Sequence, residues 1–253
     1  FGTLFYDGID FKNYIPYNYY KYYSDVSESL HAVSLDYLPG EWSPISIVEK
    51  DFQSLIFCNS GSFPGSGTVI ELDYSTDNII KYDNSEGIID GRWGIHHQGS
   101  YSNYMLVNQI IKDARDNIWI VNPFCEKNKN LLAIQDAQYG HWNHVAIPDS
   151  HSYRPQSIAF DRLDRVWIGF VYETLNDSML YSPGGIKIFS NSNLLSNGWN
   201  DTSWVSISNP SALPGNDAHA SIWSLVFDKM DLLWILSEKG VQGYEVNGNN
   251  EIT

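Results

Sequence analysis

Short runs of apolar and β-branched residues, separated by polar turns, follow one another along most of the chain. The runs are too short for helices, and no apolar pattern with a period of about 3.6 residues is long enough to indicate one. Turns rich in Gly, Asn and Asp between such runs are typical of antiparallel strands. Aromatic residues make up 15% of the sequence, which suits a pleated sheet. The pattern predicts an all-β fold.

One motif, D-x-x-D-x-[ILV]-W-I, occurs three times. Its copies begin at Asp113, Asp161 and Asp228, and their tryptophans are Trp119, Trp167 and Trp234. A strand-like run precedes each copy, and a weaker copy spans 45–57. Each unit reads as an inner strand, a Trp strand, a glycine-led strand such as Gly184–Phe189 and an outer strand such as Trp142–Ile147. Repeats of this kind predict a β-propeller of four-stranded antiparallel blades.

The residues of the motif have a structural explanation. The first Asp ends the inner strand and the second opens the hairpin, and we expect both to bond nearby backbone N–H groups. The Trp is expected to bury its ring between adjacent blades. A calcium site is the alternative explanation for the Asp pairs. Hard-cation sites usually need more oxygen ligands at tighter spacing, which favours the structural explanation.

The repeats divide the chain into one propeller domain or a fragment of one. We expect a partial blade at 1–40 and blades at about 42–90, 105–150, 154–208 and 219–253. Residues 1–16 read as the later strands of a blade, and the last unit lacks its outer strand. The two ends could complete a single blade, or the ring could be incomplete and belong to a larger propeller. We also expect additional domains in the parent protein.

Charge and cysteine content narrow the function. The net charge is −15 and the pI is about 4.6, so the surface would repel the phosphates of nucleic acid. No apolar run is long enough to span a membrane. The cysteines, Cys58 and Cys125, are too few for a disulfide scaffold. A bond between them would require neighbouring blades to approach near the axis, and the sequence leaves this open.

The units resemble the two-component-regulator propeller repeat. The best match begins at Ser157, passes through Val166–Gly169 and ends at Gly185–Phe189; the next best is 228–244. The usual turn glycine is replaced by Asn117, Arg165 or Leu232, or by the Asp that precedes each of them, and an insertion lies at Tyr172–Pro183. The resemblance implies a bacterial periplasmic sensor or a cell-surface propeller associated with type IX secretion. Its partner would be a glycan, lipopolysaccharide or an envelope protein. This implied location is periplasmic or extracellular.

In a propeller, the loops that join strand two to strand three and strand four to the next blade gather on one face. Aromatic rings stack on sugars, and Arg binds carboxylate or phosphate with two hydrogen bonds. We therefore predict a ligand-binding site on these loops, with ordinary loop packing as the alternative. Its candidate residues are Arg92, Trp93, His96, His97, Phe124, His151, Tyr153, Arg154, Tyr172 and Glu173.

Little in the sequence indicates catalysis. There is no G-x-S-x-G, H-E-x-x-H or glycine-rich phosphate loop, and the spacing of His96–His97 and of His141 and His144 does not match zinc sites. We predict no cofactor, no metal and no enzymatic activity. The Tyr-rich segment at 14–23 is either a stacking platform for glycan or an aromatic connector.

Three functional hypotheses remain. The first is a non-catalytic recognition propeller of the bacterial envelope. The second is a lyase or glycosidase, for which His, Arg and a carboxylate should cluster across blades. The third is an architectural subunit of a secretion or adhesion assembly, for which a large exposed apolar patch is expected.

Overall fold

The computed structural model describes the following parts of the chain. Backbone and side chains are described for residues 45–58, 67–82, 88–89, 105–123, 131–145, 154–173, 182–190, 205–207, 213–215 and 219–248. Strands at 3–6, 11–16, 31–35, 92–97 and 100–104 are described by their backbone.

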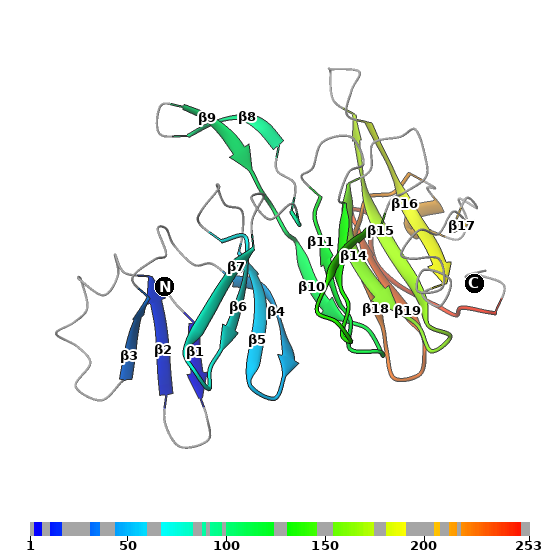
Figure 1. Cartoon of the computed structure of the whole chain (residues 1–253). Helices are drawn as coiled ribbons and strands as arrows, with labels where there is room; N and C mark the ends of the chain where they lie inside the picture. The colour runs from blue at the N-terminus through cyan, green and yellow to red at the C-terminus, as the bar shows by residue number, and fades with distance from the viewer. Residues whose placement is uncertain are drawn as a thin grey trace.

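Four antiparallel sheets follow one another along the chain, and in each the strands pair in sequence order (Figure 1). Blade 1 contains β4 (Pro44–Asp51), β5 (Ser54–Asn59), β6 (Val69–Asp73) and β7 (Asn78–Tyr82). Blade 2 contains β10 (Gln109–Lys112), β11 (Ile118–Val121), β12 (Leu132–Gln135) and β13 (Trp142–Val145). Blade 3 contains β14 (Pro155–Phe160), β15 (Arg165–Thr174), β16 (Tyr181–Ser190) and β17 (Val205–Ser206). Blade 4 contains β18 (Ile222–Phe227), β19 (Leu233–Ser237) and β20 (Gly240–Tyr244).

Two smaller sheets and a short turn of helix complete the described backbone. Strands β1 (Thr3–Tyr6) and β2 (Phe11–Pro16) are antiparallel, and β3 (His31–Leu35) pairs with β2 in parallel. Strands β8 (Arg92–His97) and β9 (Ser100–Tyr104) form a hairpin. A 3-10 helix, η3, covers Pro214–Asn216. In the described residues, no helix is both long enough and apolar enough to cross a membrane.

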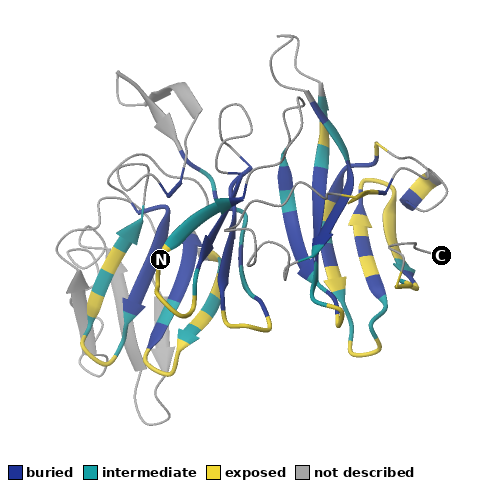
Figure 2. Cartoon of the chain, turned by 45° about the vertical axis from the view of Figure 1, so that its right-hand side comes forward, coloured by how far each residue is buried: buried dark blue, intermediate teal, exposed yellow. Residues whose placement is uncertain are grey.

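The core lies between the blades. Inner strands β4, β10, β14 and β18 contact one another in that order. One buried cluster fills each junction, and Figure 2 shows the buried residues concentrated in the strands of these blades. This arrangement explains why the strands of blades 2 and 3 carry apolar residues on both faces, since each of these two blades is covered by a neighbour on either side.

The repeated tryptophan packs between blades, as predicted. Trp119 and Trp167 are fully buried, and their rings meet Phe160 and Phe227 of the next blade edge-on at 5.6 Å. Trp234 occupies the equivalent position in blade 4 but is 42% exposed. The difference arises because no described residues cover that face of blade 4.

The first Asp of each motif connects the turn to the tryptophan. Asp161 Oδ1 accepts the N–H groups of Leu163 and Arg165, and Oδ2 accepts the indole N–H of Trp167 at 2.9 Å. Asp113 and Asp228 make the same set of contacts in their own blades. Both carboxylate oxygens therefore already accept N–H donors.

The second Asp behaves differently from the prediction. Asp116, Asp164 and Asp231 have positive φ angles of 65°, 59° and 65°, so each occupies the left-handed position that glycine usually fills in a turn. The carboxylates of Asp164 and Asp231 pair with Arg115 and Arg162 from the turn of the preceding blade. This explains the missing turn glycine, because Asp tolerates that conformation and its side chain also links the blades.

Cys58 is a free thiol, buried in the junction between blades 1 and 2. Burial raises its pKa to about 12. Cys125 lies outside the described residues.

Candidate functional site

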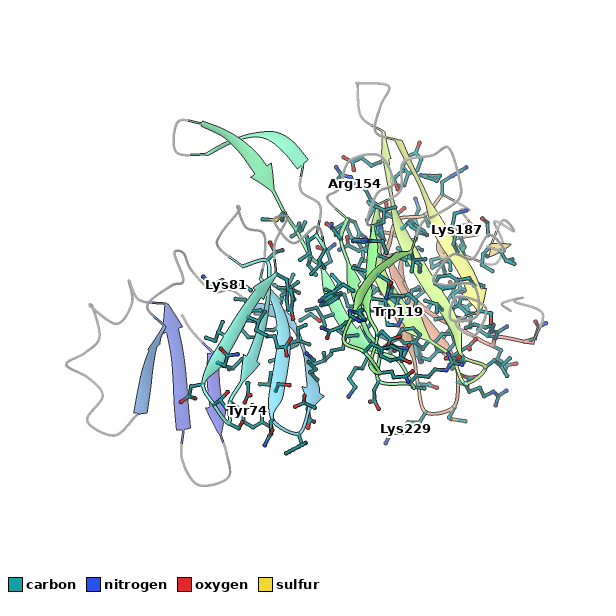
Figure 3. All side chains as sticks on the ribbon, in the orientation of Figure 1. Tyr74, Lys81, Trp119, Arg154, Lys187 and Lys229 are labelled. Carbon is teal, nitrogen blue, oxygen red and sulfur yellow. The ribbon has the colours of Figure 1, made fainter. Side chains whose placement is uncertain are left out.

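The two ends of the blades carry different kinds of turn. The D-x-x-D turns gather at one end, here called the lower end, and the described residues of the predicted binding loops, Arg154, Tyr172 and Glu173, lie at the other, the upper end. Figure 3 shows Arg154 at the upper end and Lys229, in the last D-x-x-D turn, at the lower end. At the upper end, two contacts make up the candidate site: Arg154 with Glu173 in blade 3, and Tyr172 with His219 across the junction to blade 4.

An ion pair holds the blade 3 side of the site. Arg154 immediately precedes β14, and Glu173 lies near the end of β15. Because these strands are antiparallel neighbours, the start of one meets the end of the other. Arg154 Nη1 lies 2.7 Å from Glu173 Oε2, and each side chain is about one-quarter exposed. The pair is therefore accessible from solvent.

The backbone fixes this pair in position. The N–H of Val171 donates to the carbonyl of Arg154 at 3.0 Å, and the N–H of Arg154 donates to Ser182 Oγ at 3.0 Å. Ser182 is buried at the start of β16. Three segments of blade 3 thus meet at Arg154.

Tyr172 connects blade 3 to blade 4. Its side chain is 40% exposed, and its ring lies 5.9 Å from the ring of His219. Its N–H donates to Ser221 Oγ at 3.0 Å. His219 Nδ1 lies 2.9 Å from the carbonyl oxygen of Pro183, and because a carbonyl can only accept, Nδ1 carries the proton. The two rings form a partly exposed aromatic surface across the junction of blades 3 and 4.

A glycine allows the two blades to approach here. Gly184 has φ of +69°, and a Cβ at this position would lie 2.6 Å from the carbonyl oxygen of His219. The N–H of Gly185 donates to the carbonyl of Ala220 at 3.0 Å. Any side chain at residue 184 would therefore push the loop that carries His219 away from blade 3.

The structure describes the side chains of three predicted site residues: Arg154 and Glu173 contact each other, and the ring of Tyr172 contacts His219 instead. Phe124, His151 and Tyr153 lie outside the described residues. Arg92, Trp93, His96 and His97 belong to β8, whose side chains are not described; the segment predicted as a loop forms the β8–β9 hairpin.

Sequence reasoning missed His219. His219 lies in the connection that leads from blade 3 into the inner strand of blade 4. Its position just before β18 is the signal that could have found it. The insertion predicted at Tyr172–Pro183 is in part an extension of the β15–β16 hairpin, which pairs as far as Thr174 and Tyr181.

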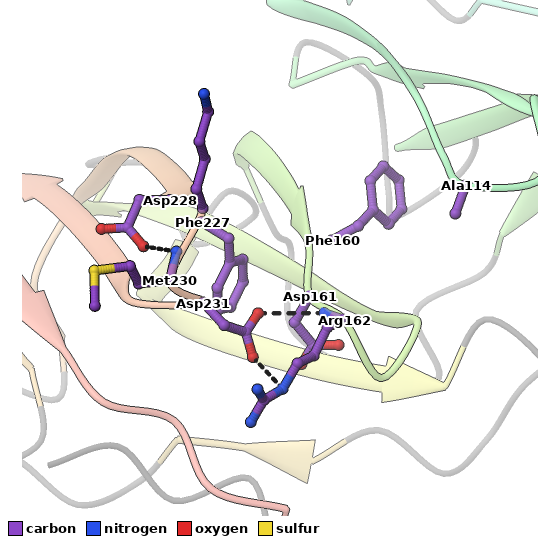
Figure 4. A pocket seen from close by; sticks show the side chains of 9 residues that line it. Ala114, Phe160, Asp161, Arg162, Phe227, Asp228, Met230 and Asp231 are labelled. Carbon is purple, nitrogen blue, oxygen red and sulfur yellow. Dashed lines mark hydrogen bonds and ion pairs between the residues drawn. The ribbon is translucent and has the colours of Figure 1, made fainter.

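A cavity at the lower end is a weaker candidate. It has a volume of about 620 Å³ and lies among the turns of blades 3 and 4 (Figure 4). Its carboxylates already have partners: Asp161 and Asp228 hold their own turns, and Asp231 pairs with Arg162 at 2.9 Å. Among the described residues, no group of three or more His, Cys, Asp or Glu side chains is placed to hold a metal ion.

Comparisons with known proteins identify the fold. No family model and no curated protein matches the sequence. The GH74 xyloglucanase of Xanthomonas campestris aligns over 81% of this chain and 28% of its own, with 15% identity and a TM-score of 0.52. PorZ, a surface component of the type IX secretion system of Porphyromonas gingivalis, aligns over 85% of this chain and 27% of its own, with 13% identity and a TM-score of 0.51.

Both structures are β-propeller proteins, so the predicted fold is confirmed. The chain spans little more than a quarter of the length of either structure, at 27% and 28%. At these identities the similarity extends to the fold, and the chemistry of the site has to be argued from its own residues.

Proposed function

We propose that this chain is a recognition propeller that binds an uncharged part of a glycan at the upper end of blades 3 and 4. The observations that carry the proposal are the Arg154–Glu173 ion pair and the partly exposed ring of Tyr172, the residue that precedes Glu173 on β15. His219 of blade 4 extends this surface across the junction.

The chemistry of the pair favours a sugar over a simple anion. A guanidinium offers several N–H donors and a carboxylate offers acceptors, and sugar hydroxyls can use both at once. Glu173 Oε2 lies 2.7 Å from Arg154 Nη1, so an anionic ligand would have to displace Glu173 to reach this guanidinium nitrogen. The ring of Tyr172 offers an apolar surface on which the C–H face of a pyranose can stack.

A binding role fits the site better than catalysis. Glycoside hydrolysis generally uses two carboxylates on either side of the scissile bond. In the described part of the chain, no second carboxylate contacts this cluster, and Glu173 is engaged by Arg154. An enzyme remains the second candidate because an Arg–carboxylate pair of blade 3 and a histidine that leads into blade 4 both lie at the upper end.

The cellular location is part of the same proposal. The sequence resemblance points to bacterial sensors and surface propellers, and PorZ, which shares the fold, is a bacterial surface component. We therefore place the chain in the periplasm or at the cell surface, where glycans and envelope proteins are available as partners.

Glycan-array screening of the purified chain, followed by calorimetry on the best saccharide, tests the proposal. Tyr172→Ala should weaken binding by about threefold to tenfold, because an aromatic contact is worth about 0.5–1.5 kcal/mol. Tyr139→Ala is the matched control, because Tyr139 also stacks beside a histidine, His141, but in a turn of blade 2. It should bind like the unmodified chain.

Two results would contradict the proposal. One is the absence of any saccharide bound at millimolar concentration by the folded chain. The other is equal loss of binding in both tyrosine variants, because the site would then lie elsewhere. Release of new reducing ends from a bound saccharide, abolished by Glu173→Gln, would establish the enzymatic alternative.

A further inference from the structure

The outward face of blade 4 repeats the pattern that is buried in every other junction described. Val226, Trp234, Leu236 and Val241 lie on this face and are 54%, 42%, 42% and 65% exposed. Figure 2 shows buried and exposed residues alternating along these strands. The equivalent residues of blade 3 are Ala159, Trp167, Gly169 and Ile186, and all four are buried.

The junctions between described blades share a second feature. A polar side chain on each inner strand bonds the backbone of the next inner strand. Ser46 Oγ accepts the N–H of Ile110 at 3.1 Å, Gln109 Oε1 accepts that of Ile158 at 2.7 Å, and Ser157 Oγ accepts that of Leu225 at 2.9 Å. Ser224 occupies the same position in blade 4. It is directed to the open face and has no such bond in the described part of the chain.

From these two patterns we propose that the open face of blade 4 is the docking surface for a further propeller blade, carried by the same polypeptide. This inference is independent of the proposed glycan site. Each described junction joins blades that follow one another in sequence, and the same arrangement would cover Trp234 and give Ser224 a backbone partner. The two structures that share the fold extend well beyond the aligned region.

The junctions also define what the incoming blade must look like. Trp119 packs on Phe160 and Trp167 packs on Phe227, and each Phe is the last residue of its inner strand. The covering blade should therefore place an aromatic residue there to meet Trp234. An Asp should follow it and open the turn.

A second copy of this chain does not meet that requirement. Blade 1 also has an exposed inner face, with Ile47 at 50% exposure at the position of Ile110. At the position of Phe160 and Phe227, however, blade 1 carries Glu49. Packing a carboxylate against Trp234 would remove it from water without a partner, which is unfavourable.

Thiol labelling tests the proposal in the protein as its gene encodes it. Val226→Cys reports the open face, and Leu163→Cys is the matched control because the two residues are 54% and 55% exposed. A covering blade should make Val226→Cys react with a maleimide at least about tenfold more slowly than Leu163→Cys, because labelling then requires local opening. Both variants should react alike in urea, and the unmodified protein gives the background from its own cysteines.

Two outcomes would overturn the proposal. Labelling of Val226→Cys within about twofold of Leu163→Cys in the folded protein would mean that the face is open to solvent. Protection that disappears on dilution, together with a concentration-dependent mass in light scattering, would mean that a second copy covers the face instead. Protection that is independent of concentration in a monomer supports it.

Discussion

Replacing Asp161 by Asn should be among the most damaging single-atom changes in the propeller. The Asp161 side chain is fully buried, and it accepts the N–H groups of Leu163 and Arg165 on one oxygen and the indole N–H of Trp167 on the other. The second oxygen also accepts Arg165 Nε–H. An Asn can keep the backbone bonds, but its NH₂ group then faces two donors.

The size of the effect follows from those two donors. Leaving a buried donor without an acceptor costs about 1–3 kcal/mol, so the two together predict a loss of about 2–6 kcal/mol. Urea unfolding followed by tryptophan fluorescence should show a lower midpoint with an unchanged slope. That is the signature of reduced stability without a change in the surface exposed on unfolding.

Asp228→Asn is the solvent-exposed comparison, in which only the indole N–H loses its acceptor because Leu232 stands where blade 3 has Arg165. Asp228 makes the same contacts to Met230, Leu232 and Trp234, but Trp234 is 42% exposed, so water can replace the lost acceptor. We expect a clearly smaller effect than for Asp161→Asn. Equal losses in the two variants, or a loss below about 1 kcal/mol for Asp161→Asn, would refute this account of the motif.

Three further predictions concern packing, titration and reactivity. Gly169→Ala should destabilise the chain by about 1–3 kcal/mol in thermal unfolding, because the new Cβ would lie 2.4 Å from Ile222 Cγ2. Gly248→Ala is the control and should be neutral, because its Cβ would meet nothing within 4 Å. The indole N–H of Trp234 and the N–H of Leu232 hold the pKa of Asp228 below its usual value of 3.8. The Asp228 carboxylate therefore stabilises the fold above pH 3.8, and this stabilisation is lost as the pH falls below that value. Urea midpoints for Asp228→Asn should vary less with pH than those of the unmodified chain between about pH 5 and 2. Burial raises the pKa of Cys58 to about 12, so its reactive thiolate form is scarce at pH 8. A disulfide reagent at pH 8 should therefore label Cys58 only after unfolding. Rapid labelling of Cys58 in the native state, located by mass spectrometry, would contradict its burial.

Part of the candidate site could be predicted from the sequence. Arg154, Tyr172 and Glu173 were found because a propeller sends particular loops to one face, so the order of strands is enough to group them. The contact between Tyr172 and His219 could not be found in this way, because it depends on how closely two blades approach at Gly184. That approach is set by backbone conformation and by packing between segments distant in the sequence.

The role of the second Asp was also beyond sequence reasoning. Asp116, Asp164 and Asp231 occupy the usual place of a turn glycine, and a pattern of letters cannot show a positive φ angle in an Asp. Nor can it show that Arg115 and Arg162 reach into the next turn. Both features arise when separate turns are brought side by side by the stacking of the blades.

The sequence by itself determined the class of fold, the strand order and the positions of the buried tryptophans. These depend on local patterns: alternation along a strand, a turn that needs an Asp, and a large ring repeated at one register. The tertiary structure decided which side chains meet at the upper end of blades 3 and 4, and which equivalent residues are buried or exposed. Trp167 and Trp234 have the same local motif, yet one is fully buried and the other 42% exposed. Burial is a property of what packs against a residue, and that is decided by neighbouring blades.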